Sequence, residues 1–178
     1  MTFRFRALRR GVGALAACAG ALAIAAEPGP ATRNCGHDDF MATALARINA
    51  VRARGATCGS HGRFDPAPPV AWNDTLARAA EAHARDMVAR DRFSHVAAPG
   101  RTLADRVGAA GYRWASLGEN IAGGYPSIDA VVAGWVKSPG HCRNLMTAKF
   151  TEVGLACVPG NASSTYPNYW TLNLGRPL

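Results

Sequence analysis

Four cysteines behind an export signal limit the possible folds of this chain more than any other sequence feature. Residues 1–25 have the layout of a signal peptide: early arginines, an uncharged stretch from Gly11 to Ala26, and a small-x-small cleavage pattern at Ala23-Ile24-Ala25. Export would carry the cysteines that follow into an oxidising compartment, where an even number predicts disulfide bonds. Beyond the leader lie four: Cys35, Cys58, Cys142 and Cys157. We therefore expect a small domain with two disulfides.

The pairing of these cysteines is not fixed by the sequence, because four cysteines permit three connectivities. Closeness along the chain favours Cys35 with Cys58 and Cys142 with Cys157, which would brace the two ends of the domain. A zinc site is the competing use of cysteine. The sequence has no Cys-x-x-Cys pair, and this argues against zinc bound by cysteine.

The leader also contains a competing signal. Leu15-Ala16-Ala17-Cys18 has the form of a lipobox, which would anchor the protein through a lipid on Cys18. The apolar stretch continues past Cys18, where a lipoprotein would turn polar, and this favours cleavage near Ala25 and a secreted or periplasmic protein. The stretch is shorter than the ~20 residues of a membrane span. No later segment is apolar enough to span a bilayer, so we predict no transmembrane segment.

Cleavage would leave about 150 residues, the size of one ordinary domain. We predict a Pro/Gly-containing linker over residues 26–36 and a monomeric domain over residues 37–178. Loss of the four leader arginines lowers the formal net charge from +8 to +4, and the remaining basic residues are spread along the chain. A nucleic-acid partner normally requires a basic patch or run, so we expect none.

Periodicity predicts helices first and strands late, which is typical of an α+β fold. The helices are expected over 38–54, from Asn73 or Asp74 to about 91, over 102–110, after Ser127, and after Ser138-Pro139 with Ser138 as N-cap. Residues 150–158 and 169–174 are rich in β-branched and aromatic residues and predict strands. Gly118-Glu119-Asn120-Ile121, flanked by glycines, predicts a loop.

Four polar residues are candidates for chemistry. His95 follows a predicted helix, and His141 lies near the start of another, whose dipole favours a neutral imidazole. Glu119 lies in the predicted loop and Glu152 in a predicted strand. Their spacing matches no local metal motif, so any site must be assembled by the tertiary fold. His83, on the apolar face of a helix, is expected to be a hydrogen-bonded core histidine.

Four short sequence motifs, taken in order, give a further indication of the family. Phe93-Ser94-His95, Gly118-Glu119-Asn120-Ile121, Ser138-Pro139-Gly140-His141 and Phe150-Thr151-Glu152-Val153-Gly154 occur in this order. Together they resemble the CAP superfamily (cysteine-rich secretory proteins, antigen 5 and pathogenesis-related proteins), in its bacterial SCP-like branch. The resemblance covers about Phe40 to Leu174.

The resemblance implies an α-β-α sandwich with a small, mostly antiparallel sheet between helical layers. It also implies a shallow cleft of two histidines and two acids that holds a divalent metal, most often zinc, in some relatives. His95 and Glu119 match the family motifs directly. Animal and plant relatives have a glutamate where this chain has Ser138 and a histidine where it has Lys149, so we assign His141 and Glu152 to the other half of the site.

Three functions fit these features. The first is an exported binding module for a lipid, glycan or protein, with a His/Glu cleft. The second is a metal-assisted hydrolase acting on peptide or cell-wall material, in which two imidazoles and a carboxylate would hold zinc and a water. The third is a purely structural secreted domain. No nucleophile motif is present, and Ser138 is expected to be occupied as an N-cap, so binding is preferred.

Overall fold

The structure is a computed structural model that describes residues 1–2 and 34–178. The predicted signal peptide beyond its first two residues, the cleavage site near Ala25 and the Cys18 lipobox lie outside the described residues. Most of the predicted linker over 26–36 lies outside them as well.

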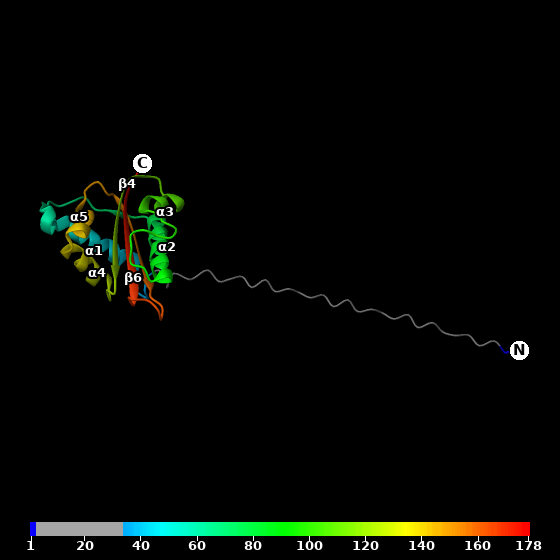
Figure 1. The fold of residues 1–178 in the computed structure, drawn as a ribbon. Helices are drawn as coiled ribbons and strands as arrows, with labels where there is room; N and C mark the ends of the chain where they lie inside the picture. Colours follow the sequence, from blue (N-terminus) through cyan, green and yellow to red (C-terminus); the bar gives the residue numbers. More distant parts are fainter. Residues whose placement is uncertain (3–33) are drawn as a thin grey trace.

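Three layers make up the described domain (Figure 1). A central sheet has α2 (Asp74–Arg90) and α3 (Leu103–Ala109) on one side. The helices α1 (Phe40–Arg54), α4 (Ile128–Lys137) and α5 (Pro139–Met146) cover the other side. This arrangement confirms the predicted α+β class and the α-β-α sandwich.

The sheet has four strands in the order β3 (Ala71–Trp72), β5 (Glu152–Pro159), β6 (Asn168–Pro177) and β4 (Trp114–Gly123). Only the β3–β5 pair is parallel, so the sheet is mostly antiparallel, as predicted. A short separate ribbon pairs β1 (Ala56–Thr57) with β2 (Arg63–Phe64) around the 3-10 turn η2 (Gly59–His61). β4 is an edge strand, which leaves one of its sides open to other segments.

Most predicted helix starts are confirmed by capping hydrogen bonds. Asn73 Oδ1 accepts from the backbone amides of Thr75 and Leu76, and Thr102 forms a capping box with Asp105. Ser127 Oγ accepts from the Ala130 amide at the start of α4. Ser138 precedes α5, but its side chain makes no capping hydrogen bond. The prediction that the Ser138 hydroxyl is occupied as an N-cap was therefore wrong.

The segment around Glu119 was predicted as a loop and is instead part of the ten-residue strand β4. The reason is the structural role of Gly118. Gly118 has no positive φ, and a Cβ built there would lie 2.8 Å from the ring of Phe150. The glycine gives room for an aromatic ring packed on the strand; it does not make a turn. Composition alone cannot separate these two uses of glycine.

The cysteine pairing was also predicted wrongly. All four predicted cysteines form disulfides, but the bonds are Cys35–Cys157 and Cys58–Cys142. Asn34 forms an isolated bridge with Cys157, which places the N-terminal segment beside β5. Each bond therefore joins segments that are distant in the sequence and adjacent in space.

A buried arginine holds the α1 side of the fold together. Arg52 is fully buried, and burial lowers the pKa of its guanidinium from the usual value. Its Nε donates to the Pro68 carbonyl at 2.7 Å and its Nη1 to the Leu145 carbonyl at 2.7 Å. Further bonds reach the carbonyls of Thr147 and Phe150, both at 3.2 Å. One side chain thus supplies donors to the segments that enter β3 and leave α5.

Replacing Arg52 by methionine should destabilise the domain strongly. A buried carbonyl left without a donor costs about 1–3 kcal/mol, so the loss of four donors should lower the free energy of unfolding by at least about 3 kcal/mol. Urea unfolding at pH 7 measures the change. Arg54→Met, at the exposed end of the same helix, is the matched control and should cost under about 0.5 kcal/mol. Equal stability of the two variants would contradict this role for Arg52.

Candidate functional site

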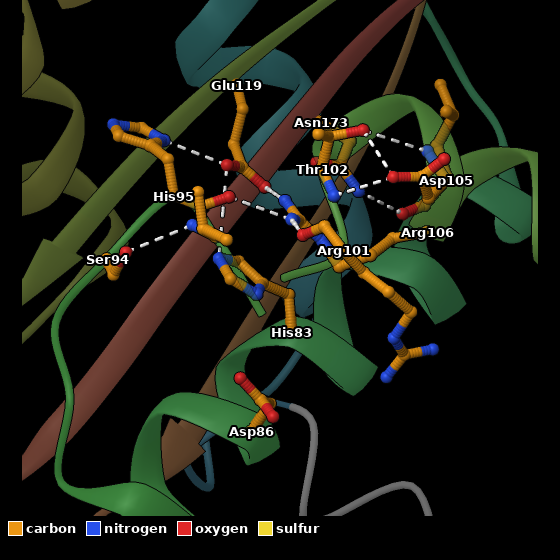
Figure 2. A network of polar contacts seen from close by, with 12 residues as sticks. His83, Asp86, Ser94, His95, Arg101, Thr102, Asp105, Arg106, Glu119 and Asn173 are labelled. Atoms are coloured by element: carbon orange, nitrogen blue, oxygen red, sulfur yellow. Dashed lines mark hydrogen bonds and ion pairs between the residues drawn. The ribbon is translucent and has the colours of Figure 1, made fainter. Parts of the chain in front are cut away.

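The carboxylate of Glu119 is the centre of the candidate site. Its side chain is 3% exposed, and it faces the α2 side of the sheet opposite Asn173 of β6. His95 Nδ1 lies 2.8 Å from Glu119 Oε1, and Arg106 Nη2 contacts Oε2. His83 Nε2 lies 3.9 Å from Oε1. Figure 2 shows the three side chains approaching the carboxylate from different sides.

Three separate elements supply these partners. His83 belongs to α2, Arg106 to α3, and His95 to the segment that follows α2. α2 comes close to the sheet at Gly154, where a Cβ would lie 2.1 Å from the Ala77 amide nitrogen. This close approach lets His83, farther along the same helix, reach the carboxylate.

Arg106 also fixes the position of His95. Its Nη1 donates to the His95 carbonyl at 2.8 Å and to the Arg101 carbonyl at 3.2 Å. The guanidinium therefore holds the Glu119 carboxylate and the backbone of His95 at the same time. The His95 side chain itself is 55% exposed, so it can meet a ligand from solvent.

Buried charge governs the electrostatics of the site. Burial alone would raise the pKa of Glu119, but the hydrogen bond with His95 and the charge of Arg106 together hold its pKa below the usual value. Glu119 is therefore ionised at neutral pH. Burial lowers the pKa of His83, although the nearby Glu119 charge acts in the opposite direction. The buried part of the site consequently holds the Glu119–Arg106 ion pair and the neutral imidazole of His83.

His141 reaches the same edge of the sheet from the opposite layer. Asn120 Nδ2 donates to the His141 carbonyl at 3.1 Å, and Asn144 Nδ2 donates to the Glu119 carbonyl at 3.0 Å. Burial and then the charge of His95 lower the pKa of His141, so the imidazole is neutral at neutral pH. The structure thus joins His95 and Glu119 by direct contact and places His141 close enough to feel the charge of His95.

Glu152 is placed elsewhere. Tyr112 donates a hydrogen bond of 2.6 Å to Glu152 Oε2, and Asn73 Nδ2 donates one of 3.2 Å. This carboxylate raises the pKa of Tyr112, after the larger effect of burial. Glu152 therefore links the cap of α2 to the end of α3 and does not join the Glu119 cluster. Within residues 34–178, no three His, Cys, Asp or Glu side chains are arranged to hold a metal ion.

Two residues of the cluster were not predicted from the sequence. His83 is fully buried, as predicted for a core histidine, but neither of its ring nitrogens has a hydrogen-bond partner among the described residues, so the predicted hydrogen bonding was wrong. It lies beside Glu119 instead, and this neighbour was not foreseen. Arg106 had no distinguishing signal, since it lies in a short helix whose sequence marks only its cap. Only the tertiary structure identifies it as the counter-ion.

A groove lies next to His141 with a volume of about 290 Å³. Four of its ten lining residues are aromatic, and two of these, Phe93 and Tyr166, pack edge-on with ring centroids 5.5 Å apart. Phe93 is 45% exposed, and Ser138 also lines the groove. A larger pocket of about 510 Å³ lies between α1 and α4, lined by Arg47, Lys137 and aliphatic residues. No histidine lines it, whereas the smaller groove is lined by His141 and by Phe93, two residues before His95, so we place the candidate site at the smaller groove.

The fold and the buried cluster around Glu119 define an α-β-α domain, and the family follows from the sequence match. The CAP family model, described as the cysteine-rich secretory protein family, matches residues 45–174. The chain therefore belongs to the CAP family. No helix among residues 34–178 is both long and apolar enough to cross a membrane.

Relatives from Bacillus subtilis share part of the sequence. The uncharacterized protein YkwD is 31% identical over 90 residues, which cover 51% of this chain and 35% of YkwD. The uncharacterized membrane protein YlbC is 34% identical over 84 residues, covering 47% of this chain and 24% of YlbC. The aligned part thus spans about a third or less of each relative.

Solved structures are similar over most of the chain. An extracellular protein with an SCP domain from Bacillus anthracis superposes with a TM-score of 0.58 at 27% identity, covering 79% of this chain and 44% of that one. An outer surface protein from Borrelia burgdorferi gives a TM-score of 0.63 at 17% identity, covering 78% and 92% of the two chains. At that identity, the second likeness shows the fold alone.

Replacing Arg106 should leave the buried charge of Glu119 without a counter-ion and so destabilise the fold. Arg106→Met leaves a buried carboxylate without its cation, which typically costs about 3–5 kcal/mol at pH 7. In the wild type, the lowered pKa of Glu119 means that its ionised form stabilises the fold above its usual pKa, a contribution that is lost as the pH falls. In the variant, protonation of Glu119 relieves the penalty. The stability gap between the two proteins should therefore narrow from pH 7 to pH 4.

Chemical denaturation across this pH range measures the gap, with Arg101→Met as the control. Arg101 is exposed, and within residues 34–178 its side chain donates to the Ala98 carbonyl alone, so its variant should lie close to the wild type at every pH. A gap for Arg106→Met that stays constant with pH would mean that Arg106 acts through packing and not through charge.

Proposed function

We propose that this chain is an exported ligand-binding module that uses the groove beside His95 and His141. The observation that carries the proposal is the accessible imidazole of His95, held by the buried carboxylate of Glu119, together with a groove lined by His141 and four aromatic residues. His95 is oriented through Nδ1 by Glu119, and its other ring nitrogen is left for a ligand. Aromatic rings give apolar contact area, and the two imidazoles give polar contacts, a combination typical of small-molecule sites.

Export is supported by three observations. The leader has signal-peptide character, the domain carries two disulfides, and relatives of similar fold are named as extracellular or outer surface proteins. Disulfides persist in oxidising compartments outside the cytosol. We therefore place the protein in the periplasm or outside the cell.

A hydrolase remains the second candidate, because Ser138 lines the groove with His141 and its hydroxyl is not used as a cap. Within residues 34–178, no hydrogen bond joins a serine hydroxyl to a histidine ring, and the cysteines there are oxidised. A serine or cysteine nucleophile needs an adjacent base. The geometry therefore favours binding over nucleophilic catalysis.

The residues present fit a metal ion only in part. The Oε2 of Glu119 is taken by Arg106, whose positive charge opposes a cation, and Glu152 is bonded to Tyr112. The donors that remain are the free nitrogen of His95 and the ring of His141. A carboxylate bonded to the second nitrogen of a histidine is, however, the usual support of a metal-ligating imidazole. We therefore propose a two-histidine zinc site with Glu119 behind it, completed by solvent or ligand, in place of four protein ligands.

Zinc should bind the purified mature protein in a pH-dependent way. Metal ligands must be deprotonated, so the affinity should fall as the pH is lowered and the ligands take up protons. His95→Ala with His141→Ala should abolish binding and leave the fold intact. His61→Ala, an exposed histidine on η2, is the matched control and should bind zinc as the wild type does. Calorimetric titration decides, and equal binding by the wild type and the double variant would contradict the site.

The ligand itself can be sought by native mass spectrometry of the protein purified from its own compartment. We expect a bound species on the wild type that falls about tenfold or more on Phe93→Ala with His141→Ala, because each lost contact weakens binding by about 1–3 kcal/mol. Ala133→Trp, which fills the larger pocket between α1 and α4, is the control and should retain the species. Loss on Ala133→Trp instead would place the ligand in that pocket and refute the groove.

A further inference from the structure

A further pocket, which shares no lining residue with the groove, lies between α2 and α3. Its volume is about 290 Å³. Three arginines and five alanines line it, and no acidic residue is among them. The arginines are Arg78 on α2, Arg101 before α3 and Arg106 on α3. Small alanine side chains leave space where a larger residue would fill it.

The arginines keep most of their donors for a ligand. Arg78 Nη2 donates to Thr75 Oγ1 at 2.9 Å, and Arg101 Nε donates to the Ala98 carbonyl at 2.9 Å. Each guanidinium has five N–H donors, so both side chains are anchored by one and present the others. Both residues are exposed. Arg78 and Arg101 thus place two anchored, solvent-accessible guanidinium groups in the lining of the pocket.

Arg106 adds a buried donor at the wall of the pocket. Its side chain is 4% exposed, and its Nε has no hydrogen-bond partner among the described residues. Buried donors are normally satisfied, and one left unpaired costs about 1–3 kcal/mol. Arg106 therefore adds a buried cation with incomplete hydrogen bonding beside the pocket, and this favours an anion there.

No acid lines this pocket, but one lies near it. Hydrogen bonds from the Thr102 hydroxyl and amide, at 2.7 and 2.8 Å, and the charges of Arg106 and Arg101 lower the pKa of Asp105, so its carboxylate offsets part of their positive charge. Glu119 balances the charge of Arg106 from the other side. Three arginines against these two acids leave the pocket with a net positive charge, to which Arg78 contributes most directly.

We propose that this pocket binds a phosphate group. Donors arrive from two helices and the segment between them, so they suit an anion whose acceptor oxygens point in several directions. A phosphate has three or more such oxygens and a charge near −2, whereas a carboxylate has two coplanar oxygens, and guanidinium groups match phosphate geometry well. The phosphate comes either from a small soluble ester or from a lipid headgroup. The site is separate from the groove, so it stands or falls independently of the proposed function.

The test measures binding of three probes to the mature protein at 0.15 M ionic strength, where nonspecific attraction is largely screened. The probes are inorganic phosphate, glycerol 3-phosphate, and phosphatidylcholine vesicles with and without phosphatidylglycerol. Arg78→Gln with Arg101→Gln should weaken binding about tenfold or more, because charge-assisted hydrogen bonds contribute about 1.5–3 kcal/mol each. Both residues are exposed, so this variant should melt like the wild type.

Arg54→Gln, an exposed arginine on α1 at the far side of the sheet, controls for the loss of charge and should bind as the wild type does. Binding of the soluble phosphates without the vesicles would assign a soluble ester. Binding of the anionic vesicles that the double variant loses would assign a lipid headgroup. Equal binding by the wild type and the double variant, an equal loss in Arg54→Gln, or no binding of any probe would overturn the proposal.

Discussion

The buried guanidinium of Arg52 is the interaction on which the helical layer around α1 depends. It sits at the inner end of α1 and donates to four carbonyls from three other segments. No acidic side chain among residues 34–178 pairs with it, so its charge is stabilised by peptide dipoles alone. Burying a charge without hydrogen-bond partners is strongly unfavourable, so the four carbonyls must stay close to the guanidinium. This requirement fixes the course of the chain around Arg52. That path places α5 against β4, and α5 carries His141.

The other face of the sheet is organised around a second buried arginine with a different purpose. Arg106 pairs with Glu119 and also holds the backbone of His95, so one guanidinium fixes both members of the exposed His–Glu pair. A buried ion pair adds little net stability, because desolvation offsets most of the attraction between the charges. It does fix orientation, and an oriented imidazole at the edge of a groove is useful for binding. The two arginines thus have different roles. Arg52 holds together the segments packed around α1, and Arg106 holds Glu119 and His95 in place.

The disulfides reinforce this division of the molecule. Cys58–Cys142 joins the turn after α1 to α5, and Cys35–Cys157 joins the start of the described domain to β5. They close loops of 84 and 122 residues, the range in which cross-links restrict the unfolded chain most. The short-range pairing expected from the sequence would have braced each end separately. The observed pairing instead fastens the outer segments to the layers that carry the site.

The sequence by itself determined the helices, two main strands, the layered fold and the family, because apolar periodicity, capping residues and ordered motifs are local signals. It also identified His95, Glu119 and His141 as neighbours through the family motifs. The tertiary structure alone decided the cysteine pairing, the strand around Glu119, the role of Arg106 and the separate position of Glu152. These features depend on which distant segments touch: Gly118 in β4 accommodates the ring of Phe150, and Tyr112 holds Glu152 away from the cluster. Such contacts leave no periodic trace in the chain, since each is made between residues whose separation the folded layers set.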